Sequence, residues 1–154
     1  MAASHKKLGE ILIGRGLITP ENFQAALREQ ARTNEYLGAI LIRNGLLKEK
    51  DLLMALSQQF DIPMVSLKNK YIDFKAAKTF SASLIRDYKC LPFSMDKDSV
   101  SVAITNPLDV WGLKKVEEET AGYKLNLVLV SEEDMREAIQ RYKKYTSKDI
   151  LKQL

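Results

Sequence analysis

The sequence predicts an α+β protein in which N-terminal tandem helical hairpins are followed by a small β-β-α-β-α subdomain. A 24-residue pattern with helical spacing occurs twice in the first sixty residues, and short strand-like runs separated by turns follow it. The chain has 154 residues, enough to bury one sizeable core or two small ones. We expect five segments: a disordered tail (1–6), a tandem helical subdomain (7–60), a connector (61–72), an α+β subdomain (73–145) and a C-terminal tail or linker (146–154).

The internal repeat is the most specific feature of the sequence. Residues 7–30 (KLGEILIGRGLITPENFQAALREQ) align without gaps with residues 36–59 (YLGAILIRNGLLKEKDLLMALSQQ), at a period of 29 residues. Ten of the 24 aligned positions are identical, whereas chance would give about one or two with these common residue types. The two segments are therefore copies of one structural unit.

Each copy is predicted to form a hairpin of two helices. The first, short helix ends where Gly16 or Gly45 can adopt the left-handed conformation of a helix C-terminus. Thr19 then has the character of an N-cap, with Pro20 in the first position of a longer helix. Apolar residues at spacings of three and four continue through that helix in both copies, so we expect two stacked hairpins.

Two pairs of repeated residues have more than one explanation. Gly9 and Gly38 lie at or near a predicted helix start, where no left-handed cap is needed. Glycine there would permit either close approach of a ligand such as a phosphate to the backbone or close packing between the hairpins. Gln30 and Gln59 each end a long helix, where the amide would either pair with a base edge or remain solvated.

The second half of the chain shows a different, mixed pattern. An extended connector with Pro63 precedes two short helices within residues 74–88. Asn106-Pro107 is expected to interrupt the chain, and Ser131 to cap the last helix. The remaining elements are strands at 89–93 and 100–104 around a turn, a helix at 109–121, a strand at 125–130 and a final helix to about residue 145. The simplest packing places the helices on one face of the sheet.

Composition and residue types argue against several classes of function. The only histidine, His5, lies in the predicted tail, and Cys90 is the only cysteine, so no catalytic triad, catalytic cysteine or metal site is expected. The net charge of +4 is spread along the chain, which gives little support to DNA or RNA binding. No apolar run is long enough to enter a membrane, and the lone cysteine fits the cytoplasm.

Two copies of L-G-x-I-L-I-x-x-G-L, each closing with A-L-x-x-Q, resemble the tandem motif of the bacterial MshEN-type domain. That domain belongs to the N-terminal domains of type II secretion and type IV pilus assembly ATPases. C-L-P-F, V-A-I-T-N-P-L-D and the closing A-I-x-x-Y extend the resemblance to about residue 145. It implies a non-catalytic cytoplasmic domain that docks onto an inner-membrane component of the machine and, in the MshEN subset, binds cyclic di-GMP for regulation.

The residues that the resemblance assigns to cyclic di-GMP are carried over by position. They are Lys7, Leu8, Gly9, Leu12, Gly16 and Gln30 from the first copy, Tyr36, Leu37, Gly38, Leu41, Gly45 and Gln59 from the second, and Asp109 of N-P-L-D. No other cofactor is implied.

Two departures from the family pattern keep a second function open. The first motif of the subset usually opens with arginine, whereas this chain has Lys7, which keeps the charge but loses the planar fork. The second copy opens with Tyr36, which can stack on a base but cannot neutralise a phosphate. The alternative is a nucleotide-independent docking module that binds an inner-membrane component. The residues of the ATPase domain itself are not among the 154, so an excised fragment and a stand-alone domain are both expected possibilities.

Overall fold

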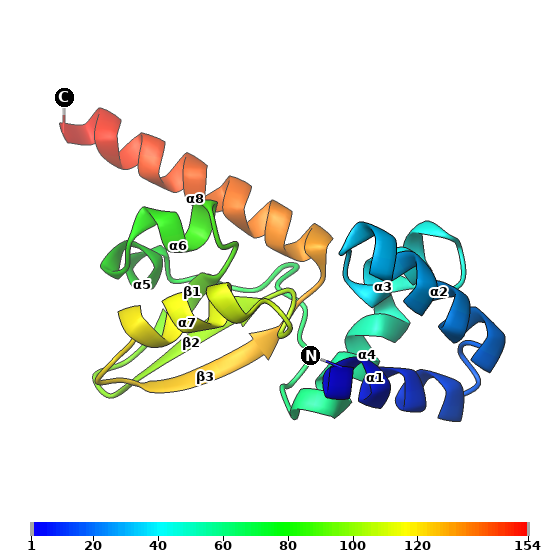
Figure 1. The fold of residues 1–154 in the computed structure, drawn as a ribbon. Helices are drawn as coiled ribbons and strands as arrows, with labels where there is room; N and C mark the ends of the chain where they lie inside the picture. Colours follow the sequence, from blue (N-terminus) through cyan, green and yellow to red (C-terminus); the bar gives the residue numbers. More distant parts are fainter. Residues whose placement is uncertain (1, 154) are drawn as a thin grey trace. The chain divides into compact units, whose positions relative to one another are not determined.

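The computed structural model describes the backbone of residues 2–153 and the side chains of residues 7–148 (Figure 1). The chain forms two compact units, residues 1–61 and 62–154. The predicted α+β class is confirmed: helices alone build the first unit, and a three-stranded sheet with helices builds the second. Among the described residues, no helix is long and apolar enough to cross a membrane.

The first unit contains the two predicted helical hairpins. Its helices are α1 (Ala2–Gly14), α2 (Pro20–Thr33), α3 (Leu37–Arg43) and α4 (Glu49–Phe60). α2 begins as predicted, because the Thr19 hydroxyl accepts a hydrogen bond from the Asn22 amide at 3.1 Å and Pro20 follows the cap. Gly16 and Gly45 end the short helices with φ of +71° and +73°, in the left-handed region that favours glycine.

The helices of the first unit pair between the copies as well as within them. α1 packs against α4, and α2 packs against α3. The short helix of each copy thus lies on the long helix of the other. Repeated leucines of both copies, such as Leu8 with Leu37 and Leu12 with Leu41, are buried in this arrangement.

Both predicted tails have helical backbone. α1 begins at Ala2, so the segment 2–6 continues the first helix toward the N-terminus. The last helix, α8 (Glu132–Gln153), continues well beyond the predicted end near residue 145. No sequence signal for helix termination stands between residues 145 and 153, since that stretch contains neither glycine nor proline.

The second unit has the predicted order of elements. They are α5 (Phe74–Thr79), α6 (Ala82–Arg86), β1 (Leu91–Met95), β2 (Ser99–Ile104), α7 (Val110–Glu119), β3 (Lys124–Leu129) and α8. The strands lie in the order β1-β2-β3, with β1 antiparallel and β3 parallel to β2. The parallel pair requires a crossover, which α7 supplies (Figure 1).

The sheet is covered on both faces, so the expectation of helices on one face is wrong. Val102 and Ala103 are adjacent on β2 and both are 0% exposed. Adjacent strand residues point to opposite faces, which means that both faces are buried. Ala103 belongs to the core cluster that includes Met135 and Ala138 of α8, and the crossover helix α7 contributes the buried Val116.

The connector between the units is part of the second unit. The Pro63 carbonyl accepts a hydrogen bond from the Leu129 amide at 2.8 Å, and the Val65 amide donates to the Leu129 carbonyl at 3.0 Å. Leu67 and Ile72 are 2% and 3% exposed in the core. The extended shape predicted from Pro63 is therefore stabilised by pairing with β3.

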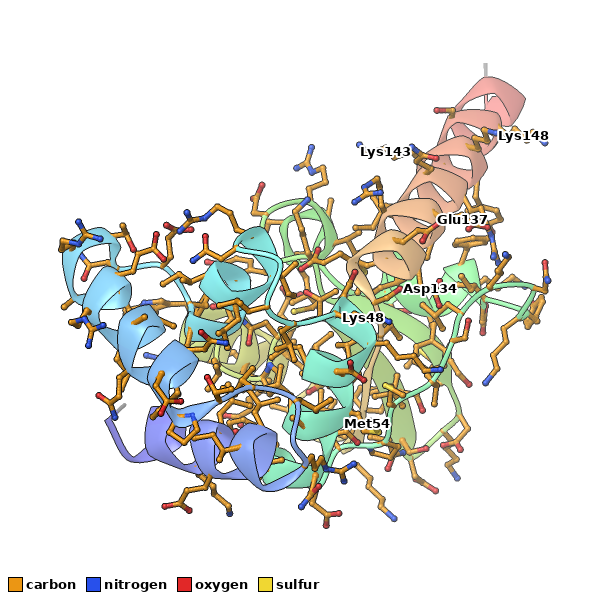
Figure 2. All side chains as sticks on the ribbon, turned by 90° about the vertical axis from the view of Figure 1, so that its right-hand side faces the viewer. Lys48, Met54, Asp134, Glu137, Lys143 and Lys148 are labelled. Atoms are coloured by element: carbon orange, nitrogen blue, oxygen red, sulfur yellow. The ribbon has the colours of Figure 1, made fainter. Side chains whose placement is uncertain are left out.

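α8 carries charges that suit a helix dipole. Ser131 caps it as predicted, since its hydroxyl accepts from the Asp134 amide at 3.0 Å. Figure 2 shows Asp134 and Glu137 near the start of this helix and Lys143 and Lys148 toward its other end. Acidic groups in the first turn stabilise a helix, and this turn carries Glu132, Glu133 and Asp134.

Candidate ligand-binding site

The first unit contains every residue that the resemblance assigns to a ligand except Asp109. Four leucines of this set are buried: Leu8 is 1% exposed, and Leu12, Leu37 and Leu41 are 0% exposed. Their burial explains their repetition as core packing. The repeated leucines are therefore part of the hydrophobic core, whether or not the motif also binds a ligand.

Gly9 and Gly38 are explained by packing within each hairpin. A Cβ on Gly9 would lie 2.3 Å from a ring carbon of Phe23, and one on Gly38 would lie 2.6 Å from a methyl carbon of Leu52. Phe23 and Leu52 occupy the same position of the two copies. Gly38 lies at the start of α3, but Gly9 lies inside α1, so its predicted place near a helix start is wrong.

The glycines that end the short helices form equivalent turns in both copies. The Gly16 amide donates to the Ile13 carbonyl at 2.9 Å, and the Gly45 amide donates to the Ile42 carbonyl at 3.0 Å. Both glycines are exposed. Their positive φ is sufficient reason for glycine at these positions, because a side chain there would strain the backbone.

The two glutamines are half-buried at the ends of the long helices. The Gln30 side-chain amide donates to the Glu35 carbonyl at 3.0 Å, which fixes the spacer between the copies. Gln59 stands at the corresponding position of α4, and its side-chain oxygen is buried. Neither glutamine is a fully solvated helix end.

Lys7 and Tyr36, the first residues of the two copies of the motif, are both exposed. Lys7 lies on α1 and is exposed, and Tyr36 immediately precedes α3 with 46% of its surface exposed. They occupy equivalent positions of the two copies. The unit thus offers a cation in one copy and an aromatic ring in the other.

Polar contacts that were not apparent from the sequence link the two copies reciprocally. The Arg15 guanidinium donates to the Gln58 side-chain oxygen at 3.1 Å, and the side-chain amide of Asn44 donates to the Glu29 carboxylate at 2.9 Å. Arg15 and Asn44 are equivalent in the repeat, as are Glu29 and Gln58. Each copy therefore donates from the same position to the same position of the other. The sequence signal was only indirect: both aligned pairs of positions carry polar residues, but nothing in the sequence shows that they contact each other.

Glu29 is the ionised centre of one of these two junctions. The hydrogen bond from Asn44 lowers the pKa of the Glu29 carboxyl below its ordinary value of 4.5, and the positive charge of Arg43 lowers it further. Guanidinium nitrogens of Arg43 lie 3.3 Å from a carboxylate oxygen of Glu29 and 2.9 Å from a carboxylate oxygen of Glu35. The corresponding junction at Gln58 has a neutral acceptor.

Asp109 lies in the second unit, where it caps α7. Its carboxylate accepts a hydrogen bond from the Gly112 amide at 3.1 Å. Asp109, Cys90 and Asn106 line one small pocket. Burial raises the pKa of the Cys90 thiol to about 12, and the charge of Asp109 adds to this rise. Cys90 is therefore an unreactive thiol at neutral pH.

The residues that the structure describes contain no metal-binding group. No three His, Cys, Asp or Glu side chains among them lie together in a way that could hold a metal ion. One acidic residue, Glu119 at the end of α7, has a structural role. Its carboxylate accepts hydrogen bonds from the backbone amide and the hydroxyl of Ser81.

The chain is similar to one protein domain family and to two pilus assembly ATPases. Residues 60–148 match the model of the MshEN domain. The type IV pilus assembly ATPase PilB of Thermus thermophilus is 34% identical over 117 residues, which are 75% of this chain and 13% of that protein. PilB of Myxococcus xanthus is 28% identical over 136 residues, 88% of this chain and 24% of that protein. The matched region thus spans a quarter or less of either relative.

Two solved structures have a similar fold. A structure of MshE with cdg has a TM-score of 0.82 and 26% identity, with 88% of this chain and 97% of that chain covered. The N-terminal domain of XpsE has a TM-score of 0.67 at 18% identity, with 90% and 94% covered. The second similarity concerns the fold alone. The family model matches the half of the chain in which the sequence motifs are looser, whereas the MshE structure covers most of the chain.

Proposed function

We propose that this chain, which belongs to the MshEN domain family, is a non-catalytic regulatory and docking domain of a type II secretion or type IV pilus assembly ATPase system. In this proposal it binds cyclic di-GMP through its duplicated motif, in the cytoplasm. The observation that carries the proposal is the similarity of 88% of the chain to MshE with cdg. We interpret cdg as cyclic di-GMP.

The geometry of the first unit supports a ligand with two equivalent halves. Cyclic di-GMP contains two identical guanylate units joined in a ring. The two copies of the motif exchange equivalent contacts, as Arg15 with Gln58 and Asn44 with Glu29 illustrate. Such a reciprocal pair presents each surface position twice, in the manner of a symmetric dimer. A two-fold ligand can use both presentations.

The exposed residues of the motif have suitable chemistry for the two parts of a nucleotide. Lys7 supplies a positive charge for a phosphate, and Tyr36 supplies a ring on which a guanine can stack. Side-chain amides such as those of Gln30 and Gln59 suit a base edge because they offer donors and an acceptor together. The Gln59 oxygen is buried, so Gln30 is the base-edge residue in this proposal. The buried leucines give the unit its shape in this proposal.

Isothermal titration of cyclic di-GMP into the whole chain tests the proposal, with GTP and cyclic di-AMP as controls. Saturable binding selective for cyclic di-GMP is expected. Lys7→Ala should weaken it about tenfold, the size of one lost charge-assisted hydrogen bond, and Lys7→Arg should strengthen it because the guanidinium binds phosphate with two hydrogen bonds. Lys50→Ala removes the same charge from the same unit and should leave the affinity unchanged. Absence of binding heat would refute the ligand.

The alternative function, a docking module that ignores nucleotides, is favoured by one feature of the second unit. Val110 and Trp111 at the start of α7 are 64% and 73% exposed. Large apolar side chains exposed next to one another are typical of protein contacts. In this alternative Trp111→Ala abolishes capture of the cytoplasmic part of an inner-membrane pilus or secretion protein, and added cyclic di-GMP does not change the capture by the wild-type chain.

A further inference from the structure

The second unit contains a cleft that plays no part in the function proposed above. Residues 69–75 and one side of α8 line an open cleft of about 550 Å³, within the range of about 300–1,000 Å³ that small-molecule sites occupy. Lys70, Tyr71, Lys75, Arg141 and Tyr145 are among the residues that line it. All of them belong to one compact unit.

Both segments that form this cleft are rich in positive charge. Residues 68–78 contain four lysines and one carboxylate, and residues 138–148 contain four cations and no carboxylate. Three of these cations, Lys70, Lys75 and Arg141, line the cleft, and Lys143 and Lys148 lie on the same helix as Arg141 (Figure 2). The one carboxylate, Asp73, lines the cleft and accepts a hydrogen bond from the Lys75 amide at 3.0 Å. The charge around the cleft favours an anion.

Aromatic rings supply the other surface of the cleft. Phe74 and Tyr145 are stacked, with ring centroids 5.1 Å apart and an angle of 24° between the planes. Tyr71 is 86% exposed, the most exposed of the large hydrophobic side chains that the structure describes. A planar ring left in solvent beside a basic cleft can gain free energy by stacking on a flat ligand.

Hydrogen bonds that need no ligand fix the two sides of the cleft relative to each other. The Arg141 guanidinium donates to the Lys70 carbonyl at 2.9 Å and joins the two sides. The Asp73 amide donates to the Phe93 carbonyl at 2.9 Å, which ties the segment to β1. Arg141 has further N–H groups that this bond does not use. The site is therefore preformed, which lowers the entropic cost of binding.

We infer that this cleft binds a nucleoside polyphosphate. Lys70, Lys75 and Arg141 contact the phosphates, and the base stacks on Tyr71. An acidic peptide would use the same cations but has no need of an isolated exposed ring, so the combination of cations and ring favours the nucleotide. The inference is independent of the duplicated motif and does not require that cyclic di-GMP binds there.

The first experiment is a titration of the ¹⁵N-labelled whole chain with ATP at low salt without magnesium. Adenosine and inorganic tripolyphosphate are the control ligands, since each carries one half of the proposed chemistry. ATP should shift the amides of residues 69–75 and 141–145 saturably, and each control should bind at least about tenfold more weakly. Shifts confined to residues 7–59 would overturn the inference, because the nucleotide would then bind at the duplicated motif.

Substitutions measure the contributions of the Tyr71 ring and of the positive charges to ATP binding separately. Tyr71→Ala should weaken ATP binding about tenfold, the lower part of the range for loss of one base-stacking contact, and Tyr71→Phe should restore it. Lys75→Gln should also weaken binding, whereas Lys97→Gln, a matched change in the β1–β2 turn, should not. Equal affinity for tripolyphosphate and ATP, with no effect of Tyr71→Ala, would reduce the cleft to a basic patch and overturn the inference. Tighter binding of a glutamate-rich peptide to the same amides would also overturn it.

Discussion

The two units of this chain use polar side chains in different ways. In the first unit, Arg15 and Asn44 reach from one copy of the repeat to the other. In the second unit, Asp96 and Asp109 bond to amides two or three residues away and close a turn or a helix start. The second unit also has long-range polar contacts, such as Arg141 with Lys70 and Glu119 with Ser81. Each of these occurs once, whereas a duplicated sequence can make the same contact twice between its copies.

The duplication of the first unit is incomplete at its surface. One junction between the copies is a neutral amide acceptor, Gln58, and the other is a carboxylate, Glu29, which also pairs with Arg43. The openings differ as well, with Lys7 in one copy and Tyr36 in the other. The interior of the unit is repeated more strictly than its surface, because packing constrains both copies equally.

The largest expected effect tests whether the interior is equivalent in the two copies. Leu12 and Leu41 occupy the same repeat position and both are 0% exposed. Truncation of either to alanine should lower the free energy of unfolding by about 2–5 kcal/mol, with similar values for the two. Urea unfolding of the single variants measures this. Leu91→Ala, at a 0% exposed position of the unrepeated unit, is the reference. A Leu12→Ala variant as stable as the wild type would contradict the equivalence.

A smaller effect is expected at the glycines that pack against the long helices. Gly9→Ala and Gly38→Ala should each cost about 1–3 kcal/mol through overpacking, since the new methyl group meets Phe23 or Leu52 at 2.3 or 2.6 Å. Each loss should be partly restored when the opposing side chain is shortened, as Phe23→Leu or Leu52→Ala. A double-mutant cycle from urea unfolding measures the coupling. Strictly additive losses would show that the glycines serve something other than this contact.

The repeat made the first unit predictable, because periodic leucines, an N-cap at Thr19 and glycine at the helix ends determine both hairpins locally. The cross-pairing of the copies was not predictable in the same way. Contacts such as Arg15 with Gln58 join residues 43 positions apart, and a single sequence carries no direct signal for them. The second unit was predicted in order, but its second buried sheet face depends on the parallel placement of β3.

The same limit applies to the candidate site: the sequence shows which positions are constrained but not which contacts constrain them. The sequence identified Gly9 and Gly38 as unusual, yet only the contacts with Phe23 and Leu52 distinguish packing from ligand approach. The resemblance assigned Asp109 to the ligand, and its bond to the Gly112 amide gives it a capping role in the structure. Residue type and spacing reveal that a position is constrained, whereas three-dimensional neighbours are needed to say by what.

The smallest expected effect concerns the one ionic junction between the copies. Hydrogen bonding from Asn44 and the charge of Arg43 depress the pKa of Glu29 in the folded state below its ordinary value of 4.5. A carboxyl with a depressed folded pKa stabilises the fold at pH values above its unfolded pKa, and this contribution is lost as the pH falls through the folded value. The wild-type chain should therefore lose more stability than Glu29→Gln between about pH 5 and about pH 3. Urea midpoints at several pH values measure the difference, and high salt should reduce it because the group is at the surface.

The neutral junction at Gln58 offers the matched control: Gln58→Ala should leave the acid dependence unchanged. If Glu29→Gln follows the wild type at every pH, the reciprocal contacts set only the geometry of the copies and do not contribute to their stability.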